Sequence, residues 1–149
     1  EFSKDNRIHI DIPDDGFRAT LTSDFGDKKS VYNFLELMKF SDVVINLAST
    51  ITLDATLFDT PVICPTFNLK LPKNSWNAAE NWYHSSHFSE ITKSGAVSLA
   101  NNMSELINEI DDTLINPDRR QKERNELCEK MMPNLPTSEL IEESIKQLL

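Results

Sequence analysis

Two short apolar runs, each typical of a strand that is buried on both faces, lie close together in the middle of the chain. Val43, Val44 and Ile45 form the first run, and residues 61–65, PVICP, form the second. The residues between the two runs fit a short, threonine-rich helix over about 50–58. A strand, a helix and a strand at this spacing predict a βαβ unit with parallel strands.

The rest of the chain alternates between the same two patterns. Residues 7–12 alternate isoleucine with polar residues, which predicts a strand, and residues 27–40 carry apolar side chains at helical spacing. Asn102 precedes a helical pattern and has Glu105 three residues further on, which is typical of a helix start. The other predicted elements are helices over 78–83, 103–115, 117–132 and 137–149 and a strand over 96–100.

This order of elements predicts an α/β fold. We expect a Rossmann-like parallel sheet flanked by helices, in three layers, followed by C-terminal helices. A chain of 149 residues is long enough for one core and too short for two, so residues 1–149 are expected to form a single domain.

Composition and charge exclude several classes of function. A formal net charge of −9 disfavours binding to nucleic acids, and no apolar run is long enough to cross a bilayer. Cys64 and Cys128 lack motif spacing, which indicates reduced thiols and a cytoplasmic protein. The 3 glycines form no phosphate-binding loop. The chain begins Glu1-Phe2 without methionine, which indicates a fragment of a larger protein.

The turn after the first buried strand carries the candidate chemistry. Ligands of parallel sheets bind at the carboxyl ends of the strands, where the next helix points its amides outward. If Ser49 caps that helix, Thr50 and Asp54 share one face. Hydroxyls and amides could then bind a diphosphate while Asp54 accepts ribose hydroxyls. The structural alternative is that Ser49 or Thr50 only caps the helix and Asp54 complements its dipole.

A resemblance supports the ligand-binding interpretation. Residues 41–63, SDVVINLASTITLDATLFDTPVI, resemble the second domain of the two-Rossmann-domain (GT-B) glycosyltransferases. Residues 87–97 are similar to the part that follows in surface-polysaccharide and CDP-glycerol-transferase-like members. The resemblance implies that Asp54 holds the nucleotide ribose and that Ser49 and Thr50 face the donor phosphates. Thr52 and His87 complete the predicted donor-nucleotide-binding residues, with His87 as a donor to a phosphate or a ring near the sugar.

The same resemblance implies what the whole protein does. The chain would be the C-terminal donor-binding domain of a glycosyltransferase of surface polysaccharide or glycoconjugate synthesis, with a nucleotide sugar as substrate and no cofactor or metal. The catalytic base would come from the missing N-terminal domain, so this chain alone should bind rather than catalyse. In the family's sheet order, two strands would precede residue 1, so the domain could be incomplete. A homodimer or the missing region could complete the sheet.

Several alternatives stay open at this point. A nucleotide-sugar epimerase of the same architecture and a non-catalytic α/β interaction module are the competing functions. His84 and His87 could share a helix face as metal ligands, although no cysteine or acid completes the set. Trp76, Trp82 and Tyr83 could form an acceptor platform or pin a loop to the core. A basic cluster is expected to be a solvated helix face; its members are Arg119, Arg120, Lys122 and Arg124.

Overall fold

The computed structural model describes residues 5–9, 28–68, 78–131 and 146 of the chain. The chain divides into two compact units, Glu1–Glu36 and Leu37–Leu149. The first unit contributes a turn within 5–9 and most of helix α2 (Lys28–Phe40), which matches the predicted helix over 27–40. The last turn of α2 and all the elements after it belong to the second unit.

A parallel sheet forms the centre of the second unit. Its strands, in spatial order, are β1 (Val44–Ile45), β2 (Val62–Pro65) and β3 (Ser98–Ala100). All neighbouring strands are parallel, and the register places Ile45 beside Ile63 and Ile63 beside Ser98. The α/β prediction, with a Rossmann-like parallel sheet, is confirmed.

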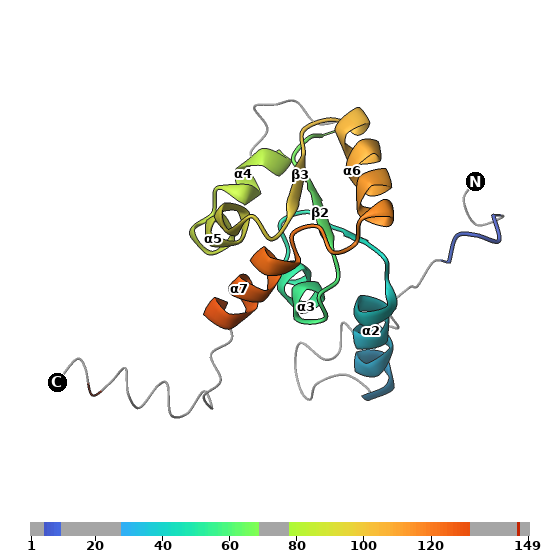
Figure 1. Cartoon of the computed structure of the whole chain (residues 1–149), viewed down its shortest axis with the longest axis horizontal. Helices are drawn as coiled ribbons and strands as arrows, with labels where there is room; N and C mark the ends of the chain where they lie inside the picture. The colour runs from blue at the N-terminus through green and yellow to red at the C-terminus, as the bar shows by residue number, and fades with distance from the viewer. Residues whose placement is uncertain (1–4, 10–27, 69–77, 132–145, 147–149) are drawn as a thin grey trace. The chain divides into compact units, whose positions relative to one another are not determined.

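Helices lie on both sides of this sheet. They are α3 (Ile51–Leu57), α4 (Ala79–Tyr83), α5 (Ser86–Ser94), α6 (Met103–Ile115) and α7 (Gln121–Met131). Figure 1 shows α4 and α5 on one side of the strands and α6 on the other. Helix α7 packs against α3 and α5, while α6 packs against β2 and β3. The sheet is therefore the middle of three layers, as the sequence predicts.

Burial differs sharply between the central strand and β1. Val62, Ile63 and Cys64 of β2 are all at most 2% exposed, because β2 has a strand on either side and helices above and below. In β1, Val44 is buried but Ile45 is 47% exposed. The prediction that the first apolar run is buried on both faces is therefore wrong at Ile45, because the helices pack mainly on β2 and β3.

The helix boundaries follow local chemistry. At the start of α6, the Asn102 side chain accepts a hydrogen bond from the Glu105 amide at 2.9 Å, and the Glu105 carboxylate accepts one from the Asn101 amide at 2.8 Å. The predicted capping pattern is confirmed. Helix α5 was not predicted, although Gly95, at a φ of +78°, ends it in the left-handed conformation that favours glycine.

One predicted strand and one predicted helix start are wrong in the described residues. The strand over 7–12 does not form in its described part, because the Ile8 amide donates to the Asp5 carbonyl at 3.0 Å and closes a turn. An ion pair of 2.6 Å between Arg7 and Asp5 holds the same turn. Residues 10–12, and the predicted helix over 137–149 apart from Lys146, lie outside the described residues. Helix α7 begins at Gln121 rather than Pro117, because residues 117–120 form turns.

Candidate functional site

Neutral polar side chains follow all three strands at their carboxyl ends. They are Asn46, Ser49 and Thr50 after β1, Thr66 and Asn68 after β2, and Asn101 and Asn102 after β3. Parallel strands bring their carboxyl ends to a single edge of the sheet, so these groups gather there. This carboxyl edge combines hydroxyl and amide groups that can both donate and accept hydrogen bonds.

Hydrogen bonds tie the β2 and β3 sides of the edge together. The Thr66 amide donates to the Ala100 carbonyl at 2.8 Å, and the Thr66 hydroxyl is 2.9 Å from the Asn101 side-chain oxygen. The Asn68 side chain accepts a hydrogen bond from the Ala79 amide at 3.0 Å, which fixes the start of α4. The residues after β2 and β3 thus hold the edge in shape.

The β1–α3 turn is tightly wound. Ala48 has a φ of +31°, a conformation that residues with a side chain seldom adopt. The Ser49 hydroxyl accepts a hydrogen bond from the Ile51 amide at 3.3 Å, and the Ser49 carbonyl accepts one from the Thr52 amide at 3.0 Å. The first amides of α3 are thus bonded within the turn. Ser49 serves as a cap, and Thr50, the formal N-cap residue, makes no side-chain capping bond.

Thr52 does not face outward with the other predicted site residues. It is fully buried, and its hydroxyl donates to the Asn46 side-chain oxygen at 3.0 Å. The Asn46 amide nitrogen is buried and has no hydrogen-bond partner among the described residues. Thr52 therefore positions Asn46, a residue that sequence reasoning missed. The signal for Asn46 was a single polar residue directly after the apolar run of β1.

Asp54 and Thr50 are placed as the spacing predicts. Thr50 is exposed, Asp54 is half-buried in the first turn of α3, and the Asp54 amide donates to the Thr50 carbonyl at 3.3 Å. Their side chains leave the same face of the helix. Within the described residues no hydrogen bond or ion pair engages the Asp54 carboxylate, so it has free capacity to accept two hydroxyl donors.

The two predicted histidines lie at the junction of α4 and α5. His87 lies in the first turn of α5, but its side chain lies outside the described residues, as does Trp76. His84 is exposed just after α4. The described part of the chain contains no group of three or more His, Cys, Asp or Glu residues that could hold a metal ion.

The aromatic residues of α4 divide into two roles. Tyr83 is buried, donates its hydroxyl to the Pro65 carbonyl at 2.8 Å and meets the Phe88 ring edge-on at 5.5 Å. It pins α4 and α5 to the end of β2, as the structural alternative predicted. Trp82 is 51% exposed and is available on the surface.

The side chains beneath the β1–α3 turn are buried. Burial raises the pKa of the Cys64 thiol to about 11, although hydrogen bonds with Thr52 and Tyr83 act in the opposite direction. Burial also raises the pKa of Tyr83. Cys64 is therefore a protonated core residue rather than a nucleophile at neutral pH.

The opposite end of α3 is closed by a buried arginine. Arg124 is 1% exposed and donates from Nε to the Asp59 carboxylate at 2.7 Å. Its other nitrogens donate to the Arg119 carbonyl at 2.7 Å and the Pro117 carbonyl at 3.2 Å. The prediction of a solvated basic face is wrong for Arg124, because its guanidinium satisfies the backbone of the turns before α7. Gln121 also bonds to Asp59.

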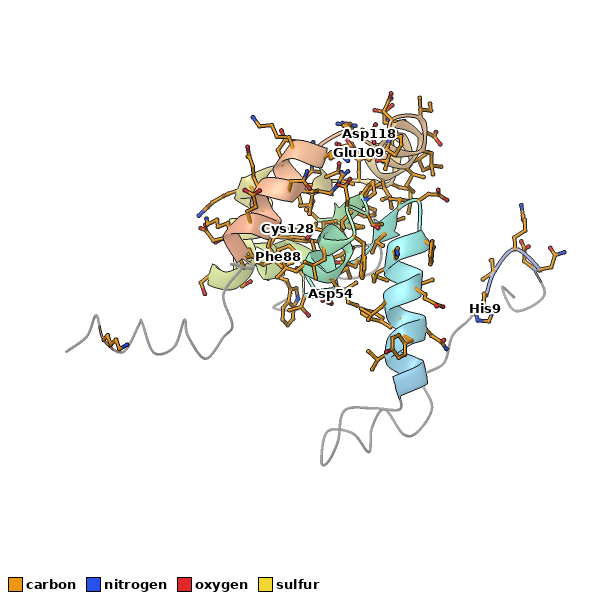
Figure 2. The ribbon with its side chains drawn as sticks, turned by 60° about the horizontal axis from the view of Figure 1, so that its bottom comes forward. His9, Asp54, Phe88, Glu109, Asp118 and Cys128 are labelled. Carbon is orange, nitrogen blue, oxygen red and sulfur yellow. The ribbon has the colours of Figure 1, made fainter. Side chains whose placement is uncertain are left out.

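Helix α7 contacts both α3 and α5 on this side of the sheet. Figure 2 labels Asp54 on α3, Phe88 on α5 and Cys128 on α7, and α7 packs against both other helices. The Cys128 thiol donates to the Thr56 carbonyl of α3 at 3.2 Å. Helix α3 is thereby held along one side by α7, while its first turn faces the carboxyl edge.

Comparison of this chain with protein-family models, curated proteins and solved structures gives no match. None of the helices in the described ranges combines the length and the apolar character that a membrane span requires.

Proposed function

We propose that this chain binds a nucleotide sugar as the C-terminal donor-binding domain of a glycosyltransferase of surface polysaccharide or glycoconjugate synthesis. The observation that carries the proposal is the carboxyl edge, where three parallel strands end in neutral hydrogen-bonding side chains. The resemblance of residues 41–63 and 87–97 to GT-B glycosyltransferases identifies the class of ligand.

The nucleoside part of the donor is proposed to contact Asp54. This carboxylate is half-buried and has no described partner, so it can accept hydrogen bonds from both ribose hydroxyls without giving up an existing interaction. A ribose at Asp54 would place the diphosphate towards the exposed Thr50, one helical turn earlier.

The phosphates are proposed to bind through side chains more than through helix amides. The Ile51 and Thr52 amides are already bonded within the turn, so α3 offers fewer free donors than an open helix terminus. On this side of the edge the exposed Thr50 hydroxyl is the available donor, whereas the Asn46 amide nitrogen has no described partner but is buried. His87 would add a donor, as the resemblance implies.

The chemistry would be group transfer from the nucleotide diphosphate to an acceptor. This chain would stabilise the departing diphosphate with hydrogen bonds, and in the two-domain architecture the catalytic base would come from the other Rossmann domain. No cofactor is required in this scheme. Both cysteines are free thiols, which fits the cytoplasmic location that we propose.

The test is calorimetric titration of UDP, CDP and GDP into the chain. Asp54→Ala removes the proposed ribose contact, and Asp111→Ala is the matched control, because Asp111 is an exposed acid in the middle of α6. We expect one nucleotide to bind, Asp54→Ala to weaken it at least tenfold, and Asp111→Ala to leave it unchanged. Equal binding by both variants would contradict the ribose contact, and no binding of any nucleotide would favour the interaction module.

A further inference from the structure

The β1 side of the carboxyl edge is held by contacts other than those of Thr66. Thr66 ties the end of β2 to the end of β3. On the β1 side, the Asn46 amide donates to a β2 carbonyl at 3.3 Å, and the chain then turns at Ala48 into α3. The β1–α3 turn carries Thr50 and Asp54, so the contact that holds this turn against β2 decides where these two side chains lie.

Tyr83 contacts both the end of β2 and the β1–α3 turn. Its hydroxyl donates to the carbonyl of Pro65, the last residue of β2, at 2.8 Å. Burial raises the pKa of Tyr83, and the Ala48 backbone acts in the opposite direction, because its N–H group lies beside the phenol oxygen. Since Tyr83 is only 6% exposed, water has little access to either contact. A single buried hydroxyl group therefore lies between the two segments.

Cys64 and Thr52 extend this contact to β1. Continuation of the β1–β2 register by one residue places Asn46 beside Cys64, on the same face of the sheet. The Thr52 hydroxyl donates to the Asn46 side-chain oxygen at 3.0 Å. The Cys64 thiol is hydrogen-bonded with Thr52 and Tyr83, and both Cys64 and Thr52 are fully buried. The four side chains form a continuous row from α4 to β1, so a change at Tyr83 can reach the turn.

The backbone of the turn needs such a support. Ala48 has a φ of +31°, and a strained residue of this kind persists only where its surroundings enforce the conformation. We infer that Tyr83 is a positioning residue: its hydroxyl holds the β1–α3 turn against the end of β2 and thereby sets the place of Thr50 and Asp54 at the carboxyl edge. The effect of Tyr83 on the turn is independent of any ligand, whereas its effect on nucleotide affinity rests on the proposed function.

Amide hydrogen exchange of the full, ligand-free chain tests the effect on the turn. Tyr83→Phe keeps the ring against Phe88, at a centroid distance of 5.5 Å, and removes only the hydroxyl. We expect the Thr52 and Leu53 amides, which are bonded within the turn, to exchange roughly three- to tenfold faster, the usual effect of one lost hydrogen bond. The Leu106 amide occupies a similar position at the start of α6, and its exchange should not change.

Tyr32→Phe is the matched control. Tyr32 is the other tyrosine of the chain and is 64% exposed, so the same chemical change there should leave all these amides unchanged. If exchange in Tyr83→Phe is equally faster at Leu106, or is unchanged in the turn, the inference is overturned, because Tyr83 then supports the whole fold or does not support the turn. A nuclear Overhauser effect between the Tyr83 ring and the Ala48 amide is expected in the wild type. Its absence contradicts the inference even if Tyr83→Phe does not fold.

Calorimetric titration then tests the consequence for a ligand. With whichever of UDP, CDP and GDP binds the wild type, Tyr83→Phe should weaken binding roughly three- to tenfold, and Tyr32→Phe should leave it unchanged. Equal affinity of the wild type and Tyr83→Phe would contradict a positioning role at the carboxyl edge. If no nucleotide binds but the turn amides exchange faster in Tyr83→Phe, the proposed function fails and the role of Tyr83 in the turn stands.

Discussion

The two ends of helix α3 use their polar groups in opposite ways. At the C-terminal end, the Asp59 carboxylate is bound by Gln121 and by Arg124, whose guanidinium also satisfies two carbonyls. At the N-terminal end, Thr50 is exposed and no described group engages the Asp54 carboxylate. One end holds the chain together, and the other has hydrogen-bonding capacity that no described group uses. A charged residue is therefore evidence for a site only where its partners are missing.

The largest expected effect on stability is at Asp59, at the C-terminal end of α3. Asp59→Ala removes the counter-charge of a guanidinium that is 1% exposed and places alanine at a φ of +59°. Breaking such a pair from one side costs about 3 kcal/mol, and the strained backbone adds to this cost. Urea unfolding followed by circular dichroism measures the loss.

Asp59→Asn is the matched control for this prediction. Asparagine tolerates the left-handed conformation and keeps an oxygen that can accept from Arg124 Nε, so it should lose clearly less stability than alanine. Equal losses in the two variants would mean that the ion pair, rather than the backbone and the hydrogen bond, accounts for the whole effect. No loss in either would refute the structural role of Asp59.

The next effect is the pH dependence of stability that arises from Cys64, in the core beneath the N-terminal end of α3. Because burial raises the pKa of Cys64 to about 11 from an ordinary 9.0, the unfolded chain loses this proton at lower pH than the folded chain. The stabilising contribution of the buried, protonated Cys64 thiol to the free energy of unfolding is fully present below pH 9. It is lost as the pH rises from 9 to 11. We expect a loss of about 2 to 3 kcal/mol over that range from this group.

Urea unfolding at several pH values tests this slope. Cys64→Ala should flatten it, because alanine has no proton to release. Burial, and after it Cys64, raise the pKa of Tyr83, so Tyr83 contributes a loss in the same direction that the variant retains only in part. A slope that is identical in the wild type and Cys64→Ala would show that Cys64 is less buried than the structure indicates.

A smaller difference in stability is expected between variants of two threonines at the N-terminal end of α3. Thr52→Val removes the hydroxyl that is bonded to Asn46, and we expect a loss of about 1 to 2 kcal/mol in the free energy of unfolding. Thr50→Val changes an exposed side chain without a capping bond, so stability should stay within about 0.5 kcal/mol of the wild type.

Nucleotide binding should weaken roughly three- to tenfold in Thr50→Val, the usual cost of one neutral hydrogen bond. If Thr50→Val destabilises the fold more than Thr52→Val, the division between the two residues is wrong.

The smallest effect is at an exposed ion pair between α5 and α7. The Lys130 ammonium is 2.7 Å from the Glu90 carboxylate and lowers its pKa, but both side chains are largely exposed. Glu90→Gln should therefore leave the urea midpoint unchanged, because water and salt screen such pairs. A clear shift would show that surface pairing, and not only the buried Arg124, holds α7 in place.

Sequence patterns predict the fold well wherever the signal is local. The buried run of β2, the short helix α3 and the Asn102–Glu105 cap are all visible as patterns, and the structure contains them. Arg124 could not be predicted, because a buried arginine requires carbonyl partners that only the folded turns bring together. Helix α5 was missed although Gly95 marks its end.

The candidate site shows the same limit. Spacing places Thr50 and Asp54 on one face, which needs only the period of a helix. That Thr52 turns inward to Asn46 depends on which face of α3 packs against the sheet, and the threonine-rich sequence of this helix does not reveal that face. The ligand itself is a proposal that rests on the resemblance.

The most direct test of the central claim is nucleotide titration followed by amide chemical shifts. With whichever of UDP, CDP and GDP binds, we predict the largest shifts in residues 46–54, 66–68 and 101–102, along the carboxyl edge. Amides around Asp59 and Arg124 should stay unchanged. Shifts centred on the Arg124 end, or a saturable response to none of the three nucleotides, would contradict the assignment of the open end of α3 as the donor site.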